Sequence, residues 1–295
     1  MKKRKLLESG AEAVLFACAL LSILTVLFIT IFLFQRGLPL FKKISILEFL
    51  FSSNWEPTAA APHYGILSFI LGSIYVTGLS LIFAVPVGLA VGIYLAELAE
   101  KRASRAIKSA VEILAGIPSV IYGLFGIALI SAATRFLFGG SGYSLLSASI
   151  VLAIMTLPTI INVTEVSLRA VPSELKEGSL ALGATHWQTI VKVLIPAARS
   201  GIIAGVVLGM GRAIGETMAV LMVGGNAPIM PKGLTEKVRT LTMNIITDMS
   251  YAKGDHLTSL FTTGIVLFVF ILALNLTVQL ALKRSISGVE GDMGA

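Results

Sequence analysis

The chain has 295 residues, of which 56% are hydrophobic and 13% charged, and its mean hydropathy is +0.90. Soluble domains carry about 25% charged residues, so this composition excludes a soluble globular protein and indicates an integral membrane protein. The net charge of +7 comes from short basic clusters beside apolar runs, which argues against nucleic-acid binding. The single cysteine, Cys18, lies inside the first apolar run, so a disulfide framework and a cysteine metal cluster are excluded.

Several apolar runs are long enough to cross a membrane. The first follows a basic start, residues 1–5, but it exceeds the apolar core of about 7–15 residues in a signal peptide, so we expect a membrane helix. The second contains Pro86, which predicts a kink that neighbouring helices can tolerate. We therefore expect an all-α polytopic protein with a single transmembrane domain over residues 1–295. The expected spans are residues 11–34, 66–95, 111–136, 145–163, 201–224 and 257–282.

The basic residues that flank these runs predict the orientation of the chain. Six spans place both termini on one side of the membrane, and that side carries fourteen Lys and Arg residues against eight on the other. Lys and Arg accumulate on the cytoplasmic side. We therefore expect a multi-pass protein of the cytoplasmic membrane, surrounded by lipid, with both termini in the cytoplasm.

Residues 165–199 form the longest segment with regularly placed polar residues, between the fourth and fifth spans. A helix in its first half is expected to end in a left-handed turn at Gly183. Thr185 and Gln188 have the capping-box spacing for a second short helix, which Pro196 is expected to stop. A helix, a glycine elbow and an amphipathic helix form a shape that fits a groove on a soluble partner. The alternative is an ordinary loop between two membrane helices.

The fifth span holds two ionisable residues in a glycine-rich stretch. Arg212 lies about half-way along the run, where an unpaired arginine costs about 2.5–3.5 kcal/mol. Glu216 is four residues on, so one helix face can carry both side chains and they can pair. One interpretation is a structural lock between helices. The other, which we favour because charges inside membranes are usually functional, is a substrate path in which Arg212, Glu216 and Thr217 meet an oxyanion.

The sequence lacks the motifs of several enzyme classes. It carries no G-x4-G-K-[ST] phosphate loop, so we expect that this chain does not hydrolyse ATP and holds no cofactor. His63, His186 and His256 are isolated in polar segments and predict solvated or interfacial histidines, not a metal site. No nucleophile and base stand in a catalytic pattern, so we expect a transporter subunit without catalytic residues.

The 165–199 segment resembles the pattern E-A-A-x3-G-x9-I-x-L-P of the permease subunits of ABC importers. The two alanines of the family are here Gly178 and Ser179, and its Ile and Leu are also replaced by other aliphatic residues. The resemblance implies the type I architecture of ABC importer permeases and a cytoplasmic loop that docks on a dimer of ATPase subunits. The docking positions that it implies are Glu177, Gly183, Ala184, Val193 and Pro196.

Three further stretches resemble the phosphate-specific branch of these permeases, and within it the C-type subunit. They read PSVIYGLFG at 118–126, GRAIGETMAV at 211–220 and GGN at 224–226. The resemblance covers nearly the whole chain. It implies import of inorganic phosphate together with a second, A-type permease subunit, the ATPase dimer and a periplasmic phosphate-binding protein. The residues by themselves leave open another oxyanion, such as sulfate or molybdate, and an anion transporter that works without an ATPase.

Overall fold

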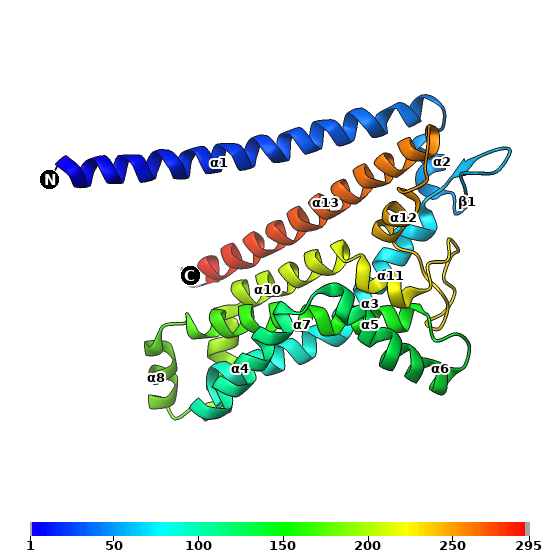
Figure 1. Cartoon of the computed structure of the whole chain (residues 1–295). Helices are drawn as coiled ribbons and strands as arrows, with labels where there is room; N and C mark the ends of the chain where they lie inside the picture. The colour runs from blue at the N-terminus through cyan, green and yellow to red at the C-terminus, as the bar shows by residue number, and fades with distance from the viewer. Residues whose placement is uncertain (1, 293–295) are drawn as a thin grey trace.

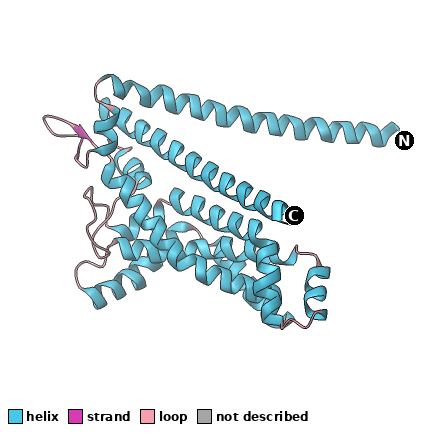
Figure 2. Ribbon diagram, turned by 180° about the vertical axis from the view of Figure 1, so that it is seen from behind, coloured by secondary structure: helices cyan, strands magenta, loops and turns pink. Residues whose placement is uncertain are grey.

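The computed structural model describes residues 2–292, whose regular secondary structure is helical apart from one two-stranded hairpin (Figures 1 and 2). Six helices in this part of the chain are long and apolar enough to cross a membrane, so the predicted all-α architecture with six spans is confirmed. These helices cover Gly10–Lys42, Leu67–Leu98, Ser119–Phe138, Leu145–Arg169, His186–Gly215 and Asp255–Thr277.

The secondary structure follows the chain in a simple order. Most long helices contain a short turn of different geometry, so one membrane span can consist of two or three elements. The elements are α1 (Lys2–Gly37), the 3-10 turn η1 (Leu38–Lys42), α2 (Ile46–Phe51), β1 (Trp55–Glu56), β2 (His63–Tyr64), α3 (Leu67–Ile93), the π-helical turn η2 (Tyr94–Leu98), α4 (Lys101–Gly116), α5 (Ser119–Phe125), the π-helical turn η3 (Gly126–Ser131), α6 (Ala132–Phe138), α7 (Leu145–Arg169), α8 (Ser173–Ala181), α9 (His186–Thr189), the π-helical turn η4 (Ile190–Leu194), α10 (Ile195–Gly215), α11 (Met218–Gly224), α12 (Leu241–Asp248) and α13 (Asp255–Asp292).

Helix α7 is the centre of the structure. In its most apolar stretch 61% of the residues are buried, against 28% or less in the other five spans. Helix α3 approaches it closely because Gly88 lies against Ile160 and Gly92 against Thr164, where an added Cβ would come within 2.7 Å of either side chain. On another side, Gly209 of α10 faces Ile160, with 3.0 Å left for a Cβ. Small residues therefore let three helices pack backbone to backbone.

Helix α1 stands apart from this core. Figures 1 and 2 show that it runs beside α13 and diverges from it toward the N-terminus. The contact is closest near Gly37, whose carbonyl accepts a hydrogen bond of 2.8 Å from Thr262 Oγ1, and Phe32 packs edge-on against Phe261. None of the most apolar stretch of this span is buried. A helix that is apolar on all sides and mostly exposed is suited to lipid.

The prediction that the third span covers residues 111–136 is wrong at its N-terminal end. Ile117 and Pro118 have extended backbones, and the spanning helix begins only at Ser119. Proline lacks an N–H and keeps the residue before it out of the helical conformation, so the helix breaks there. The residues before the break belong to α4, a separate amphipathic helix on which Val111 is buried and the basic residues of 101–108 are grouped. Such a helix suits a membrane surface.

Replacing Gly92 by alanine tests the contact between α3 and α7. The added Cβ would lie 2.7 Å from Thr164 Cβ and 3.1 Å from the Ile161 carbonyl oxygen, so the helices must separate. Gly78→Ala is the matched control, because Gly78 lies in the same helix and its Cβ would meet nothing within 4 Å. Both alanines gain the same helix propensity, so we expect Gly92→Ala to be less stable than Gly78→Ala by about 1–3 kcal/mol. Thermal unfolding in detergent measures the difference, and equal midpoints would contradict it.

Candidate functional site

The 165–199 segment has the predicted helix, glycine elbow and second helix. Helix α8 ends just before Gly183, which has a φ of +85°. The capping box that follows is formed: Gln188 N donates to Thr185 Oγ1 over 3.2 Å, and Thr185 N donates to Gln188 Oε1 over 2.9 Å. In Figure 1, α8 projects at one end of the molecule, next to α4.

The prediction that Pro196 stops the second helix is wrong. The helix continues without interruption over His186–Gly215, so α9, η4 and α10 form one continuous helix. Pro196 is the second residue after the π-helical turn Ile190–Leu194. Proline inside an α-helix removes one backbone hydrogen bond and clashes with the preceding turn, and the wider π-helical turn gives its ring room. The second half of the segment is therefore rigidly joined to the fifth span.

Large apolar side chains on this segment face outward. Leu182 is 92% exposed and Trp187 62% exposed, whereas Ile190 and Leu194 on the same second helix are buried against α7 and α3. An exposed apolar surface of this kind marks a protein or membrane contact. Three of the predicted docking positions, Glu177, Gly183 and Pro196, are exposed, and Ala184 and Val193 are partly buried. The patch, called the apolar patch below, consists of Leu175, Leu180, Leu182, Trp187 and Val191.

The segment is fastened to the end of α3. Lys176 Nζ forms an ion pair of 2.6 Å with Glu97 Oε2, and His186 Nε2 lies 3.3 Å from the carbonyl oxygen of the same glutamate. Glu97 belongs to the π-helical turn η2. Ser179 and Thr189 join the two helices of the segment to each other, with their hydroxyl oxygens 3.0 Å apart. The elbow is thus tied to the end of α3 by an ion pair.

Glu165 forms a second attachment that sequence reasoning did not identify. Its side chain is 2% exposed and lies near the end of α7. It accepts a hydrogen bond of 2.9 Å from Arg169 Nε and pairs with Lys108 Nζ of α4 at 3.3 Å. Arg169 Nη2 also donates to the Leu95 carbonyl over 2.8 Å. One buried carboxylate therefore joins α4, α7 and the end of α3. The only feature of the sequence that points to Glu165 is that it is a charged residue in the last turns of an apolar run.

The structure differs from the prediction that the fifth span covers residues 201–224. Helix α10 ends at Gly215, Glu216 is extended (φ −70°, ψ 132°), and a new helix, α11, starts at Met218. Glu216 Oε1 accepts a hydrogen bond of 3.1 Å from Ala219 N, so the carboxylate caps α11. The Glu216 carbonyl accepts a bond of 3.1 Å from Thr242 Oγ1 of α12. These two contacts satisfy one N–H and one carbonyl at the break.

The predicted pairing of Arg212 with Glu216 is not made. The helix ends between the two residues, so they do not share a helix face. Arg212 lies in the last turn of α10 and is exposed, and no side chain that the structure describes forms an ion pair with it. Around it, a Cβ on Gly211 or Gly215 would meet nothing within 4 Å. The arrangement leaves a guanidinium with free donors on an open, glycine-lined surface, which is suited to an anion.

A pocket of about 380 Å³ opens at the break. The predicted path residue Thr217 lines it, and so does Thr242 from α12. The Thr217 hydroxyl is within 3.3 Å of the Gly215 carbonyl. The structure thus brings Glu216 and Thr217 together with α12, a helix that the sequence did not connect with the site. The pocket is lined by Thr217, Met218, Thr242, Ile245 and Ile246.

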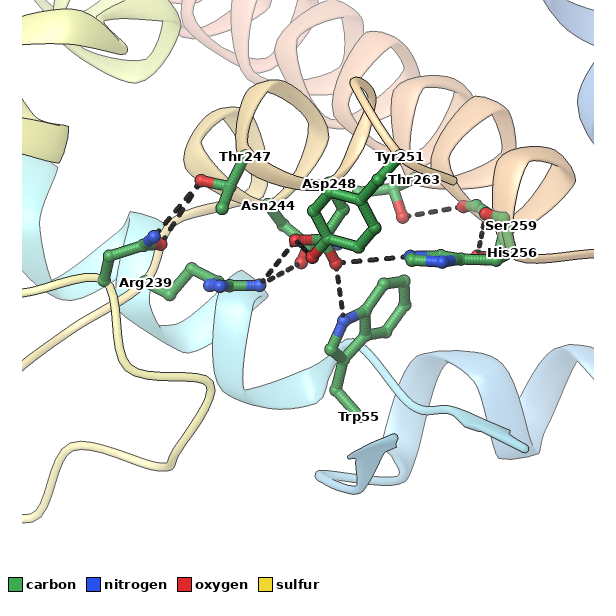
Figure 3. Close-up of polar contacts among 10 residues, drawn as sticks. Trp55, Arg239, Asn244, Thr247, Asp248, Tyr251, His256, Ser259 and Thr263 are labelled. Atoms are coloured by element: carbon green, nitrogen blue, oxygen red, sulfur yellow. Dashed lines mark hydrogen bonds and ion pairs between the residues drawn. The ribbon is translucent and has the colours of Figure 1, made fainter. Parts of the chain in front are cut away.

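A buried polar cluster lies at the other end of α12 (Figure 3). Asp248 is 2% exposed and accepts hydrogen bonds from Trp55 Nε1 at 3.1 Å, Arg239 Nη1 at 3.3 Å and the Tyr251 hydroxyl at 2.7 Å. His256 Nε2 is 3.3 Å from its second oxygen. The prediction of a solvated or interfacial His256 is therefore wrong, because the ring is buried against the tryptophan. These five residues are called the Asp248 cluster below.

Tyr251 is a permanent donor in this cluster. Partial burial, and then the hydrogen bond and the charge of Asp248, raise the pKa of Tyr251 above its ordinary value. A raised pKa keeps the phenol protonated at neutral pH. Its hydroxyl can therefore donate to the carboxylate under all physiological conditions.

Glu165→Gln tests the attachment of α4 and α7. The amide keeps the size of the side chain but loses both ion pairs, so we expect the protein to lose about 1.5–3 kcal/mol of stability. Glu112→Gln is the matched control, because Glu112 is an exposed glutamate on α4 without an ion pair to any described side chain. Amide hydrogen exchange across α4, η2 and α8 is the measurement. Exchange that rises equally in both variants, or in neither, would contradict the role of Glu165.

Comparison with known proteins places the chain in a family. Residues 88–287 match the family described as "Binding-protein-dependent transport system inner membrane component". The chain is 42% identical over 273 residues to the probable ABC transporter permease protein YqgH of Bacillus subtilis (strain 168), covering 91% of this chain and 88% of that protein. It is 37% identical over 243 residues to the phosphate transport system permease protein PstC of Mesorhizobium japonicum, covering 75% and 74%.

Solved structures show the same fold. A crystal structure of a bacterial alginate ABC transporter, in complex with an alginate pentasaccharide-bound periplasmic protein, contains a chain that superimposes with a TM-score of 0.63 at 16% identity. The superposition covers 91% of this chain and 94% of that one. The matched residues 88–287 include α7, the 165–199 segment and the break after α10. The chain therefore belongs to the inner membrane components of binding-protein-dependent transport systems and is a multi-pass protein of the inner membrane.

Proposed function

We propose that this chain is the C-type permease subunit of an ATP-driven importer of inorganic phosphate. The observation that carries the proposal is the 37% identity, over about three quarters of both chains, to a phosphate transport system permease protein. Further relatives with the same description, from Pasteurella multocida and Xylella fastidiosa, are 34% and 35% identical over 80% and 83% of this chain. The exposed guanidinium of Arg212 supports an anionic substrate.

The 165–199 segment is the docking loop for a dimer of ATPase subunits, which bind ATP and Mg. The exposed apolar patch around the Gly183 elbow supports this role. The ion pair between Lys176 and Glu97 ties the loop to α3, and the Glu165 contacts tie its base to α7 and α4. When the ATPase dimer closes, it pulls on the loop and reorients the helices around the substrate path. Alternating access follows from that movement.

The chain supplies one side of the path, and a second, A-type permease supplies the other. The docking loop and both termini lie on the cytoplasmic side of the membrane. Figure 1 supports it, because the ends of the described chain lie toward the same end of the molecule as α8. The opposite end, with the β1–β2 hairpin and α12, then faces the periplasmic phosphate-binding protein.

Arg212 attracts the substrate, while Glu216 and Thr217 shape the path beside it. A guanidinium is permanently charged and offers a planar set of donors that fits a phosphate oxyanion. The Glu216 carboxylate caps α11, so it does not neutralise Arg212 in this conformation. A phosphate ion that leaves the binding protein meets an unpaired positive charge at the end of α10.

Uptake of labelled phosphate into cells tests substrate and site together. Cells that carry the gene, with other phosphate systems removed, should take up phosphate in an ATP-dependent way that sulfate does not compete with. Arg212→Gln should lower uptake more than tenfold while the complex still assembles, because only the charge of the path is lost. Arg135→Gln, an exposed arginine on α6, is the control and should transport normally. Unchanged uptake after deletion of the gene would discard phosphate as substrate, and loss of assembly in Arg212→Gln would make Arg212 a structural residue.

The elbow can be tested through its backbone alone. Gly183 has a φ of +85°, and an alanine there costs about 1–2 kcal/mol, whereas Gly178 lies in α8 with normal helical geometry. A Cβ at either position would meet nothing within 4 Å. We expect Gly183→Ala to weaken ATPase association by roughly fivefold or more and Gly178→Ala to leave it intact. Co-purification of the ATPase subunit, with uptake measured in parallel, decides between a docking elbow and an ordinary loop.

A further inference from the structure

The Asp248 cluster joins parts of the chain that are far apart in sequence. Trp55 comes from the hairpin that follows α1 and α2, Arg239 from the stretch before α12, and His256 from the start of α13. Trp55 and Arg239, which both donate a hydrogen bond to Asp248, are 193 and nine residues away from it in the sequence. All three converge on the last residue of α12, and Figure 3 shows their side chains pointing at the one carboxylate.

A short path of contacts leads from this cluster to the break in the fifth span. Arg239 is followed directly by Thr240, which caps α12 through Met243 N. The Thr240 hydroxyl lies 3.0 Å from that of Thr242, and Thr242 donates to the Glu216 carbonyl over 3.1 Å. Arg239 lies just before α12 and Asp248 is its last residue, so their ion pair connects the two ends of this helix. Helix α12, held in this way, lines the pocket at the break with Thr242, Ile245 and Ile246.

We propose that Asp248 is a positioning residue for transport: it holds α12 against the α10–α11 break, so that Thr242 fixes Glu216 and the pocket beside it. It does not touch the substrate. The inference rests on the proposed function, because it assigns Asp248 a role in movement along the Arg212, Glu216 and Thr217 path. It also gives the hairpin a role, since Trp55 transmits a displacement at the outer surface to the same carboxylate.

A buried carboxylate with four donors is suited to this task. A buried ion pair adds little net stability over apolar packing, but it allows one geometry only, because either partner left alone is an unpaired buried charge. Arg239 is held in place further by a hydrogen bond of 3.0 Å from its Nη1 to the side-chain oxygen Oδ1 of Asn244, and by the face of the Phe69 ring. The start of α12 has one more anchor, the bond of 3.0 Å from Leu241 N to Ser73 Oγ. Loss of Asp248 therefore loosens α12 without releasing it from α3.

The test compares Asp248→Asn with Asp255→Asn in the complete complex with its ATPase and binding protein. Asp255 is the matched control, because it forms an exposed ion pair of 2.6 Å with Lys43 at the same end of the molecule. We expect Asp248→Asn to lower the maximal phosphate uptake rate per permease about tenfold. The half-saturating phosphate concentration should change less than twofold, because the residue does not bind substrate. Asp255→Asn should transport like the unaltered protein.

A second measurement reports the geometry without any substrate. Met218 and Ile246 line the pocket from its two sides and are both partly exposed, so cysteines at these positions can be joined by a short bismaleimide in a Cys18→Ser background. Asp248→Asn should slow this cross-linking about tenfold and Asp255→Asn should not. Trp55→Phe, which keeps an aromatic ring and removes one donor, should give a smaller effect in the same direction and serves if Asp248→Asn does not fold.

The outcomes separate this inference from the proposed function. Cross-linking and uptake per permease that remain normal in both Asp248→Asn and Trp55→Phe would overturn the positioning role. A reduced amount of protein with an unchanged rate per molecule would also overturn it, since Asp248 would then act on folding alone. If the unaltered complex does not import phosphate, the proposed substrate fails, and the cross-linking comparison still decides whether Asp248 positions α12.

Discussion

The structure depends on one constraint, that backbone polar groups inside a membrane must find partners within the protein. Unbroken helices meet it by themselves, which is why six long helices make up most of the chain. A break meets it only with help from side chains and neighbouring elements. At Glu216 the carboxylate caps α11 and Thr242 bonds the released carbonyl. At this break another element of the same protein reaches the irregular backbone, and Arg212 and Thr217 lie beside it.

The parts of the fold that follow from local sequence could be predicted, and the parts that depend on distant partners could not. Long apolar runs predicted six spans, and the Thr185 and Gln188 spacing predicted the second helix of the 165–199 segment. The break after Gly215 depends on Thr242, which is 26 residues from Glu216 in sequence. No periodicity in residues 201–224 reports that contact. At Pro196 the error was the opposite: a helix end was predicted, but the helix continues. The π-helical turn before Pro196 accommodates a residue that usually ends a helix.

The same distinction applies to the charged residues of the site. Arg212 and Glu216 were identifiable because a charge inside an apolar run is rare, yet their pairing was inferred from helical spacing that the break removes. Glu165 and Asp248 were missed because their partners come from other elements. Lys108 is 57 residues from Glu165, and Trp55 is 193 residues from Asp248. Residue type gave candidates, and only the tertiary structure decided which of them act as anchors.

The two anchors lie at opposite ends of the helix core, and the break after α10 lies between them. Glu165 holds the end of α7 to α4 and α3, and Asp248 holds α12 to the hairpin and to α13. Each is a buried carboxylate, so each end of the molecule has one preferred geometry. Between these ends, Gly211 and Gly215 leave open space around α10, and Arg212 stands there without an ion pair to any described side chain. The two-residue break beside the exposed arginine is therefore the point between the two anchors at which the helical backbone is interrupted.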